Sequence, residues 1–166
     1  MAKLIIGFSK PKDHPFPVFS KLIQWFEGVD YSHSYVKWYS STYDTYLVYH
    51  AAGFGLHFLG EKEASRRLDI VKEYELEVDP EIKRALVGYC IREAGTPYGL
   101  KTVFGLALTR IFKLRSNPFS DGDRTQFCSE AVANILSNHF NIELHKPAEE
   151  FGVRDLELLM KELTQG

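Results

Sequence analysis

The sequence has few cysteines and no long apolar run, and each shortage excludes a class of protein. Cys90 and Cys128 are its only cysteines, and no Cys-x-x-Cys pair or Cys/His cluster accompanies them. We therefore expect neither a disulfide framework nor structural zinc, and the thiols indicate a reducing compartment. No apolar stretch approaches the roughly 18 residues of a membrane-spanning helix. The N-terminal apolar run is too short for a signal peptide, so we expect a soluble, cytoplasmic protein.

The chain also lacks an excess of charge of either sign. Twenty Lys and Arg stand against 22 Asp and Glu, and the net charge of -2 argues against a nucleic-acid-binding surface. With 45% hydrophobic and 25% charged residues, a chain of 166 residues suits one compact domain with a full core. Neither repeats nor a linker divides it. We expect a single domain over residues 1–166.

Strand patterns occupy the first half of the chain and helix patterns the second. Aromatic, β-branched and alternating segments predict five strands, at residues 3–9, 31–39, 45–52, 56–59 and 69–78, with one helix at 18–27. Residues 61–67 form a charged surface segment. Apolar residues at helical spacing predict four further helices, at about 80–94, at 100–114, around Cys128 as far as His139, and at 153–163. This order indicates an α+β fold whose antiparallel sheet packs against helices. Cys90 lies in the helix at 80–94 with Leu86, Val87 and Ile91 nearby, and we expect it to pack in the core.

The segment around Cys128 predicts a polar loop that runs into a helix, with the cysteine in or near the first turn. Asp123 or Thr125 can serve as N-cap, and Asp123 with Gln126 fits the spacing of a capping box. A thiol there faces unpaired backbone N–H groups and the positive end of the helix dipole, which favour the thiolate. Packing is the alternative, and on the helix alone it is favoured. The cysteine belongs to an apolar stripe at helical spacing: Phe127, Cys128, Ala131, Val132, Ile135 and Leu136.

Two of the six histidines can be brought together by strand pairing. If the hairpin of strands 31–39 and 45–52 turns between Ser41 and Thr42, His33 lies directly opposite His50. A turn centred one residue later makes the two diagonal neighbours on the same face. A metal pair is the weaker interpretation, because no third Asp, Glu or Cys stands at a fitting spacing. The other histidines are expected to be ordinary loop, strand or helix residues: His14, His57, His139 and His145.

A thiolate nucleophile needs a base within hydrogen-bonding reach, and the base needs a third polar group that fixes its orientation. Cys128 as nucleophile, His33 as base and general acid, and His50 as orienting residue would meet these needs. Backbone N–H groups at the helix start could form part of an oxyanion hole. Gln126 and Tyr98 are candidate side-chain donors, although Tyr98 fits ordinary packing equally well. Glu130 fits a solvated helix-face carboxylate.

Four segments carry a family resemblance: YSHSYV at residues 31–36, VYHAAG at 48–53, GTPYG at 95–99 and FCSEAVA at 127–133. In order and approximate spacing they resemble the permuted NlpC/P60 (papain-like) cysteine hydrolases, in particular the bacterial and viral YiiX-like branch. The resemblance spans about residues 3–160 and implies a circularly permuted papain-like domain. It implies Cys128 as nucleophile, His33 as base and His50 as third residue. Many permuted members carry an acidic residue where His50 stands, so this position departs from the pattern.

With this resemblance, catalysis becomes the favoured interpretation of Cys128. It implies hydrolysis or transfer at an amide or ester through a thioester acyl-enzyme, with no cofactor or metal. The first hypothesis is a peptidase or amidase of the peptidoglycan type. The second is a lipid-directed thiol acyl hydrolase or acyltransferase whose helix 100–114 could lie on a membrane surface, although a core helix is the favoured interpretation of such a stripe. The third is a non-catalytic binding or virion structural domain.

Without a secretion signal, a cell-wall substrate would be reached by lysis, by a virion or by a dedicated exporter. A phage origin is compatible with that route.

Overall fold

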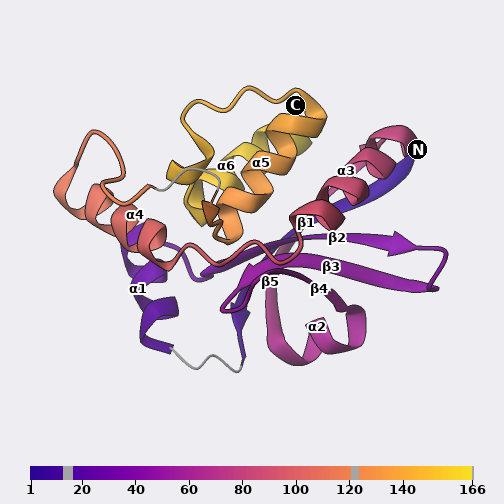
Figure 1. The fold of residues 1–166 in the computed structure, drawn as a ribbon, viewed down its shortest axis with the longest axis horizontal. Helices are drawn as coiled ribbons and strands as arrows, with labels where there is room; N and C mark the ends of the chain where they lie inside the picture. The colour runs from indigo at the N-terminus through magenta and orange to yellow at the C-terminus, as the bar shows by residue number, and fades with distance from the viewer. Residues whose placement is uncertain (13–16, 121–123, 166) are drawn as a thin grey trace.

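The computed structural model describes residues 1–12, 17–120 and 124–165 and is built on a five-stranded antiparallel sheet (Figure 1). The strand order is β4-β3-β2-β1-β5, so the first strand in sequence lies between the second and the fifth. The strands are β1 (Ala2–Pro11), β2 (His33–Ser40), β3 (Thr45–Ala52), β4 (Gly55–Gly60) and β5 (Leu68–Val78). All five predicted strands are confirmed, as are the α+β class and the antiparallel sheet.

Helices cover the two faces of the sheet unequally. One face lies under α3 (Pro80–Glu93), α5 (Cys128–Phe140) and α6 (Val153–Gln165), and the other under the short α2 (Glu61–Arg67) (Figure 1). The charged segment 61–67 is therefore a helix, which the sequence analysis did not predict. A 3-10 turn, Ala148–Glu150, precedes α6. No helix in the described ranges has both the length and the apolar character needed to span a membrane.

Two helices lie together at one end of the sheet, beside the start of β2 (Figure 1). They are α1 (Pro17–Glu27) and α4 (Leu100–Phe112), and we call the pair the α1–α4 lobe. Both were predicted from apolar spacing. The loop predicted around His14 lies outside the described residues.

The core divides at the sheet because side chains alternate along each strand. Under α3, α5 and α6, the strand residues Ile6, Val36 and Tyr49 pack against helix residues that include the buried Cys90, as predicted for that cysteine. Burial raises the pKa of Cys90 to about 12. A smaller cluster packs under α2: Tyr35, Val48, Leu59, Ala64 and Leu68.

One buried carboxylate fastens α6 to the sheet. Glu157 is 5% exposed and accepts hydrogen bonds from Tyr31, from Lys72 at 2.7 Å and from Tyr74 at 3.0 Å. Lys161 adds an ion pair at 3.1 Å. Burial alone would raise the pKa of Glu157, but these donors lower it to about 2.

We expect Glu157→Gln to lower the free energy of unfolding by about 2–3 kcal/mol at pH 7, because the folded state stabilises the charged form. The folded pKa of about 2 lies below the ordinary 4.5. The contribution is therefore complete above pH 4.5 and is lost as the pH falls toward 2. Urea denaturation of both proteins between pH 2 and pH 7 measures it.

Glu75→Gln is the matched control, because Glu75 pairs with Lys3 on the surface at 2.6 Å and should leave stability nearly unchanged. A Glu157→Gln difference that stays the same at pH 2 as at pH 7 would contradict this account.

Candidate active site

Helix α5 begins at Cys128 itself, and Phe127 occupies the N-cap position. The N-cap predicted at Thr125 is wrong, and Asp123, with its capping box to Gln126, lies outside the described residues. Instead, Gln126 forms a short parallel bridge with Tyr98. The Gln126 N–H donates to Pro97 O at 3.0 Å and the Gly99 N–H to Gln126 O at 3.1 Å. This pairing holds the chain extended up to the residue before the helix.

The buried side chain of Glu130 caps the start of α5. Its Oε2 accepts the Phe127 N–H at 3.2 Å, which is half of a capping box, since Phe127 has no polar side chain to return the bond. The carboxylate is 3% exposed, so the prediction of a solvated helix-face residue is wrong. Glu130 holds the backbone that presents Cys128.

The Cys128 thiol is buried next to polar groups. Its side chain is 3% exposed, Sγ lies 3.8 Å from Ser32 O, and Tyr98 lines the same small cavity as the sulfur. Burial raises the pKa of the thiol, against the N–H groups of Ser34 and Ser129, which favour the thiolate. The expectation that the helix start favours the thiolate is thus correct for those N–H groups but is outweighed by desolvation. The resting thiol is neutral.

The thiol borders a small internal cavity of about 10 Å³, which has room for about one water molecule. Tyr98 and Ser129 share its wall. The remaining wall is largely apolar and comes from the α1–α4 lobe and α6: Ile23, Phe26, Val103, Leu106 and Val153. The lobe therefore covers Cys128.

The histidine pair forms, in the second of the two predicted registers. Tyr35 pairs with His50, so the turn is centred one residue later than the directly opposed arrangement requires, and that arrangement is wrong. His33 is the diagonal neighbour on the same face. Its Nε2 lies 2.8 Å from His50 Nδ1, and the two rings are nearly perpendicular at 85°.

A third histidine, which the sequence analysis treated as an ordinary strand residue, joins this pair. Gly53 and Phe54 link β3 to β4, so Ala52 pairs with Gly55 and the register places His57 opposite His50. The Nε2 atoms of His50 and His57 are 3.0 Å apart, and His57 Nδ1 lies 2.8 Å from Gly55 O. Gly53 and Gly55 indicate this tight turn in the sequence, and the strand-pairing argument used for His33, applied to that turn, would have found His57.

His33, His50 and His57 form a hydrogen-bonded row that we call the histidine chain. The carbonyl oxygen of Gly55 determines which nitrogen donates in each of its hydrogen bonds. Gly55 O can only accept, so His57 Nδ1 carries a proton. With the three rings neutral, His57 Nε2 then accepts from His50, and His50 Nδ1 accepts from His33 Nε2. The basic nitrogen of His33 is therefore Nδ1. Burial, together with the neighbouring His33 and His57, holds the pKa of His50 well below its usual value.

The predicted site residues form two groups separated by β2. His33 and His50 share the α2 face with Tyr35, whereas Cys128 packs with Val36 on the face under α5. Sγ approaches the backbone of Ser32, next to His33. Gln126 and Tyr98 lie with the thiol. Gln126 is 3% exposed, and its Oε1 finds no donor among the described residues.

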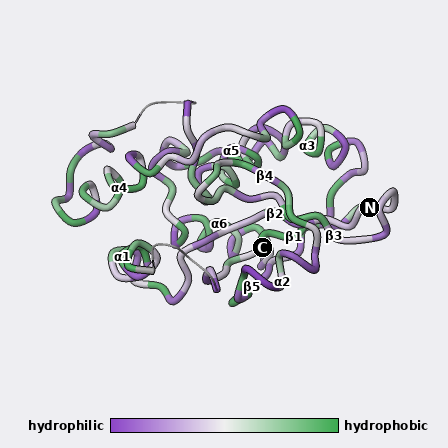
Figure 2. The backbone as a smooth tube through the Cα atoms, turned by 60° about the horizontal axis from the view of Figure 1, so that its bottom comes forward, coloured by the Kyte–Doolittle hydropathy of each residue, from purple (hydrophilic) through white to green (hydrophobic). Residues whose placement is uncertain are grey.

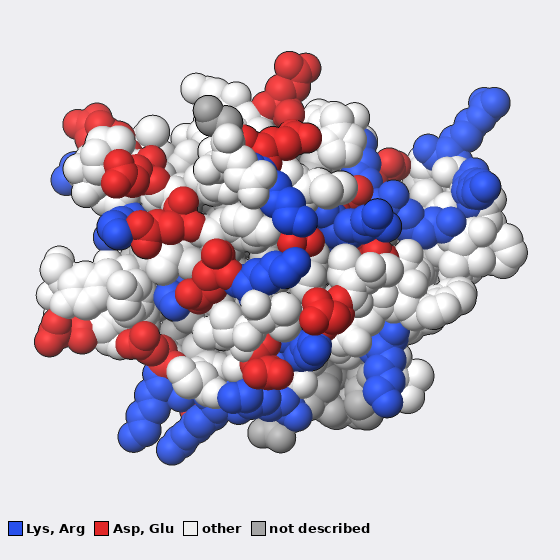
Figure 3. All heavy atoms as spheres, turned by 180° about the vertical axis from the view of Figure 1, so that it is seen from behind, with Lys and Arg blue, Asp and Glu red and all other residues white. Residues whose placement is uncertain are grey.

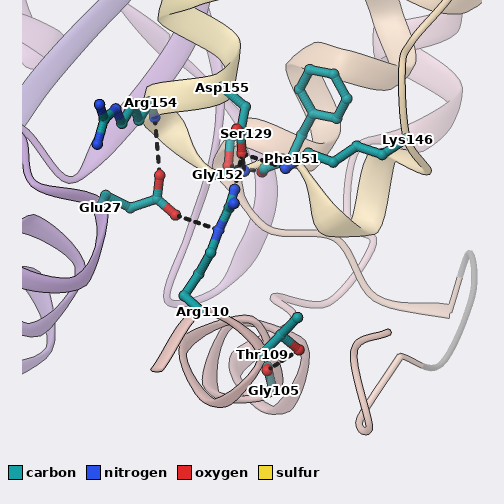
Figure 4. Close-up of polar contacts among 10 residues, drawn as sticks. All are labelled: Glu27, Gly105, Thr109, Arg110, Ser129, Lys146, Phe151, Gly152, Arg154 and Asp155. Atoms are coloured by element: carbon teal, nitrogen blue, oxygen red, sulfur yellow. Dashed lines mark hydrogen bonds and ion pairs between the residues drawn. The ribbon is translucent and has the colours of Figure 1, made fainter. Parts of the chain in front are cut away.

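A polar network ties the α1–α4 lobe to the start of α6 (Figure 4). Arg110 pairs with Asp155 and lies 3.8 Å from Glu27, which accepts the Arg154 N–H at 3.2 Å. Lys146 also pairs with Asp155, at 2.7 Å. Burial raises the pKa of Glu27, and Arg110 opposes that rise. These contacts fasten the cover of the cavity.

The fold matches a crystal structure described as metalloprotein yiiX from Escherichia coli O157:H7 (DUF1105), with a TM-score of 0.60. The two proteins share a fold. The match covers 98% of this chain and 81% of the other at 20% sequence identity, which supports the YiiX-like resemblance at the level of the fold. No protein-family model matches the sequence, and no curated protein matches it.

Gly152→Ala should weaken the contacts that hold the α1–α4 lobe against the start of α6. A Cβ at position 152 would lie 2.0 Å from Glu27 Oε1, so the carboxylate has to leave its place in the network. We expect a loss of about 1–3 kcal/mol in the free energy of unfolding, measured by urea denaturation. Gly60→Ala, where a Cβ meets nothing within 4 Å, is the control. Equal stability of the two variants would contradict this role of Gly152.

The histidine chain predicts three tautomers that long-range ¹H–¹⁵N NMR can assign: protons on Nε2 of His33 and His50 and on Nδ1 of His57. We expect His57→Leu to abolish the preference at His50, because the acceptor for its Nε2–H is gone. His145→Gln, whose ring packs on Phe151, should change nothing in the chain. A neutral His33 protonated on Nδ1 in the unmodified protein would overturn the assignment.

Proposed function

We propose that this protein is a thiol hydrolase or acyltransferase that attacks an amide or ester carbonyl with Cys128. The observation that carries the proposal is the position of the thiol at the first residue of α5, beside the Tyr98 hydroxyl and the N–H groups of Ser34 and Ser129. Groups of this kind stabilise negative charge on sulfur and on a carbonyl oxygen. Gln126, two residues before the thiol, is the further candidate donor.

In the proposed reaction, Cys128 Sγ bonds to the carbonyl carbon and its proton passes to His33 Nδ1, which then protonates the leaving group. Water, or an acceptor in a transfer reaction, releases the acyl group from the thioester. His50 and His57 are positioning residues that keep the proton of neutral His33 on Nε2. Because β2 separates ring and thiol, the start of β2 and the lobe have to shift before this transfer. The described arrangement is the resting form.

The walls of the cavity favour an acyl chain as the group nearest the thiol. The charged residue of the lining, Glu27, is already engaged with Arg110 and the Arg154 N–H. Ile23, Phe26, Val103 and Leu106 offer no polar partners to the charged groups of a cell-wall peptide. A lipid-directed acyl hydrolase or transferase therefore fits this lining better. A peptidase or amidase of the peptidoglycan type, supported by the sequence resemblance, is the second candidate.

The structural neighbour is described as a metalloprotein, but the three histidines of this chain do not fit a metal ion. A metal ion needs its donor nitrogens about 2.0–2.1 Å from one point. Here His50 turns Nδ1 to His33 and Nε2 to His57, so the three rings do not converge, and His57 Nδ1 is taken by Gly55 O. Among the described residues, no group of three or more His, Cys, Asp or Glu could hold a metal ion.

The test is incubation of the protein with phospholipid vesicles or with purified muropeptides, followed by mass spectrometry of products and protein. We expect an acyl adduct on Cys128 and lysolipid or free fatty acid from the vesicles. Cys128→Ala should reduce product by at least about 10³-fold, and His33→Gln by about 10²–10⁴-fold. Cleaved muropeptides instead of lipid products would select the second candidate.

Cys90→Ala is the matched control, because it removes the other buried thiol and should keep the activity. Product formation that survives Cys128→Ala would refute the proposal. So would a folded wild type that acts on neither substrate, which would indicate a non-catalytic domain.

A further inference from the structure

The α1–α4 lobe differs in charge from the rest of the chain. Residues 17–27 and 100–120 contain five of the 20 Lys and Arg but one of the 22 Asp and Glu, Glu27, which is buried 3.8 Å from Arg110. The other residues therefore account for nearly all of the negative charge. Seen from behind, the end of the molecule formed by the lobe shows blue and white atoms with little red (Figure 3).

Exposed apolar side chains gather on the same lobe. Hydrophobic residues occupy much of α4 (Figure 2). Leu100, Phe104 and Ile111 share one side of the helix and are 52%, 49% and 44% exposed. Phe112 is 66% exposed, and Phe119 stacks on Phe104 at 6.1 Å. With Leu114, at 43%, these residues make up what we call the α4 face: Leu100, Phe104, Ile111, Phe112, Leu114 and Phe119.

Three exposed cations accompany the α4 face. Lys101 lies beside Leu100, and Lys113 and Arg115 flank Leu114 at the end of the helix. There they line an open groove of about 340 Å³, to which Lys146 and one carboxylate, Glu150, also contribute. Arg110 is not among them, because Asp155 and Glu27 pair with it. Residues 100–120, which carry the α4 face, contain no Asp or Glu. An apolar surface bordered by Lys and Arg complements a partner whose interior is apolar and whose outer surface is anionic.

We propose that the α4 face binds the surface of an anionic lipid membrane. The rings of Phe104, Phe112 and Phe119 enter the boundary between headgroups and acyl chains, and Lys101, Lys113 and Arg115 pair with lipid phosphates. A second copy of this chain fits poorly, because its α4 face would set cations against cations. Nucleic acid would use the cations but would leave the aliphatic side chains Leu100 and Ile111 against water.

The opposite side of α4 supplies Val103 and Leu106 to the wall of the Cys128 cavity. A membrane-bound α4 therefore places the cavity one helix diameter from the acyl chains. This link to a lipid substrate rests on the proposed function, but membrane binding does not. Binding is accordingly measured on Cys128→Ala, where catalysis plays no part.

The experiment is co-sedimentation of Cys128→Ala with sucrose-loaded vesicles of phosphatidylcholine alone or with about a third phosphatidylglycerol. We expect binding to the anionic vesicles, weaker binding to neutral ones, and weakening by salt. Adding Lys113→Glu and Arg115→Glu should lower the partition coefficient at least about twentyfold. Adding Phe104→Ser and Phe112→Ser should lower it at least about tenfold.

Phe54→Ser and Lys62→Glu are matched controls, since Phe54 is 95% exposed in the β3–β4 turn and Lys62 lies on α2, away from the α1–α4 lobe. Unfolding curves should show that all variants fold. A parent protein that stays in solution with anionic vesicles overturns the proposal, as does equal loss in the controls. Vesicle binding without any lipid product from the wild type would support the surface and refute only the lipid-directed activity.

Discussion

Strand β2 is buried on both of its faces, and the arrangement of the site depends on that constraint. Each step along the strand sends a side chain to the opposite side of the sheet. Val36 and Trp38 therefore enter the core under α5, while Tyr35 packs toward α2. Tyr35 lies so close over β1 that a Cβ on Gly7 would meet its ring at 2.0 Å. A shift of β2 by one residue would exchange both sets at once, which fixes the register of the strand from Tyr35 to Trp38.

The balance at Cys128 follows from the same packing. Backbone N–H groups at a helix start lower the pKa of a thiol, and removal from water raises it. Here removal from water prevails, because the α1–α4 lobe leaves room for about one water beside the sulfur. A thiol kept neutral under a cover does not react with every electrophile in solution. In the proposed reaction, a movement of the α1–α4 lobe would admit the substrate and expose the thiol to water in the same step, so that access and activation would coincide.

Much of this fold could be predicted from the sequence because strands and helices have distinct apolar periods. The predictions of five strands, of their antiparallel pairing and of Cys90 in the core were correct. The register was one of two alternatives that differed by one residue in the turn, and local sequence could not choose between Ser41–Thr42 and the next position. The helix start was missed because the pairing of Gln126 with Tyr98, distant in sequence, keeps the preceding residues extended. Burial of Glu130 likewise depends on tertiary packing, which a helical repeat does not contain.

The histidine chain ends at a peptide carbonyl, and this gives Gly55 an importance that a residue without a side chain rarely has. Gly55 has a φ of +101°, and a Cβ there would lie 2.1 Å from Thr96 O. The backbone around it is held by bonds from Leu56 N to Thr96 O and from Gly95 N to Leu56 O. Any larger residue would displace the carbonyl that orients His57. The Gly55 carbonyl thus determines, through His57 and His50, which nitrogen of His33 carries the proton. Gly55 cannot ionise, so mutagenesis limited to titratable residues would overlook its role.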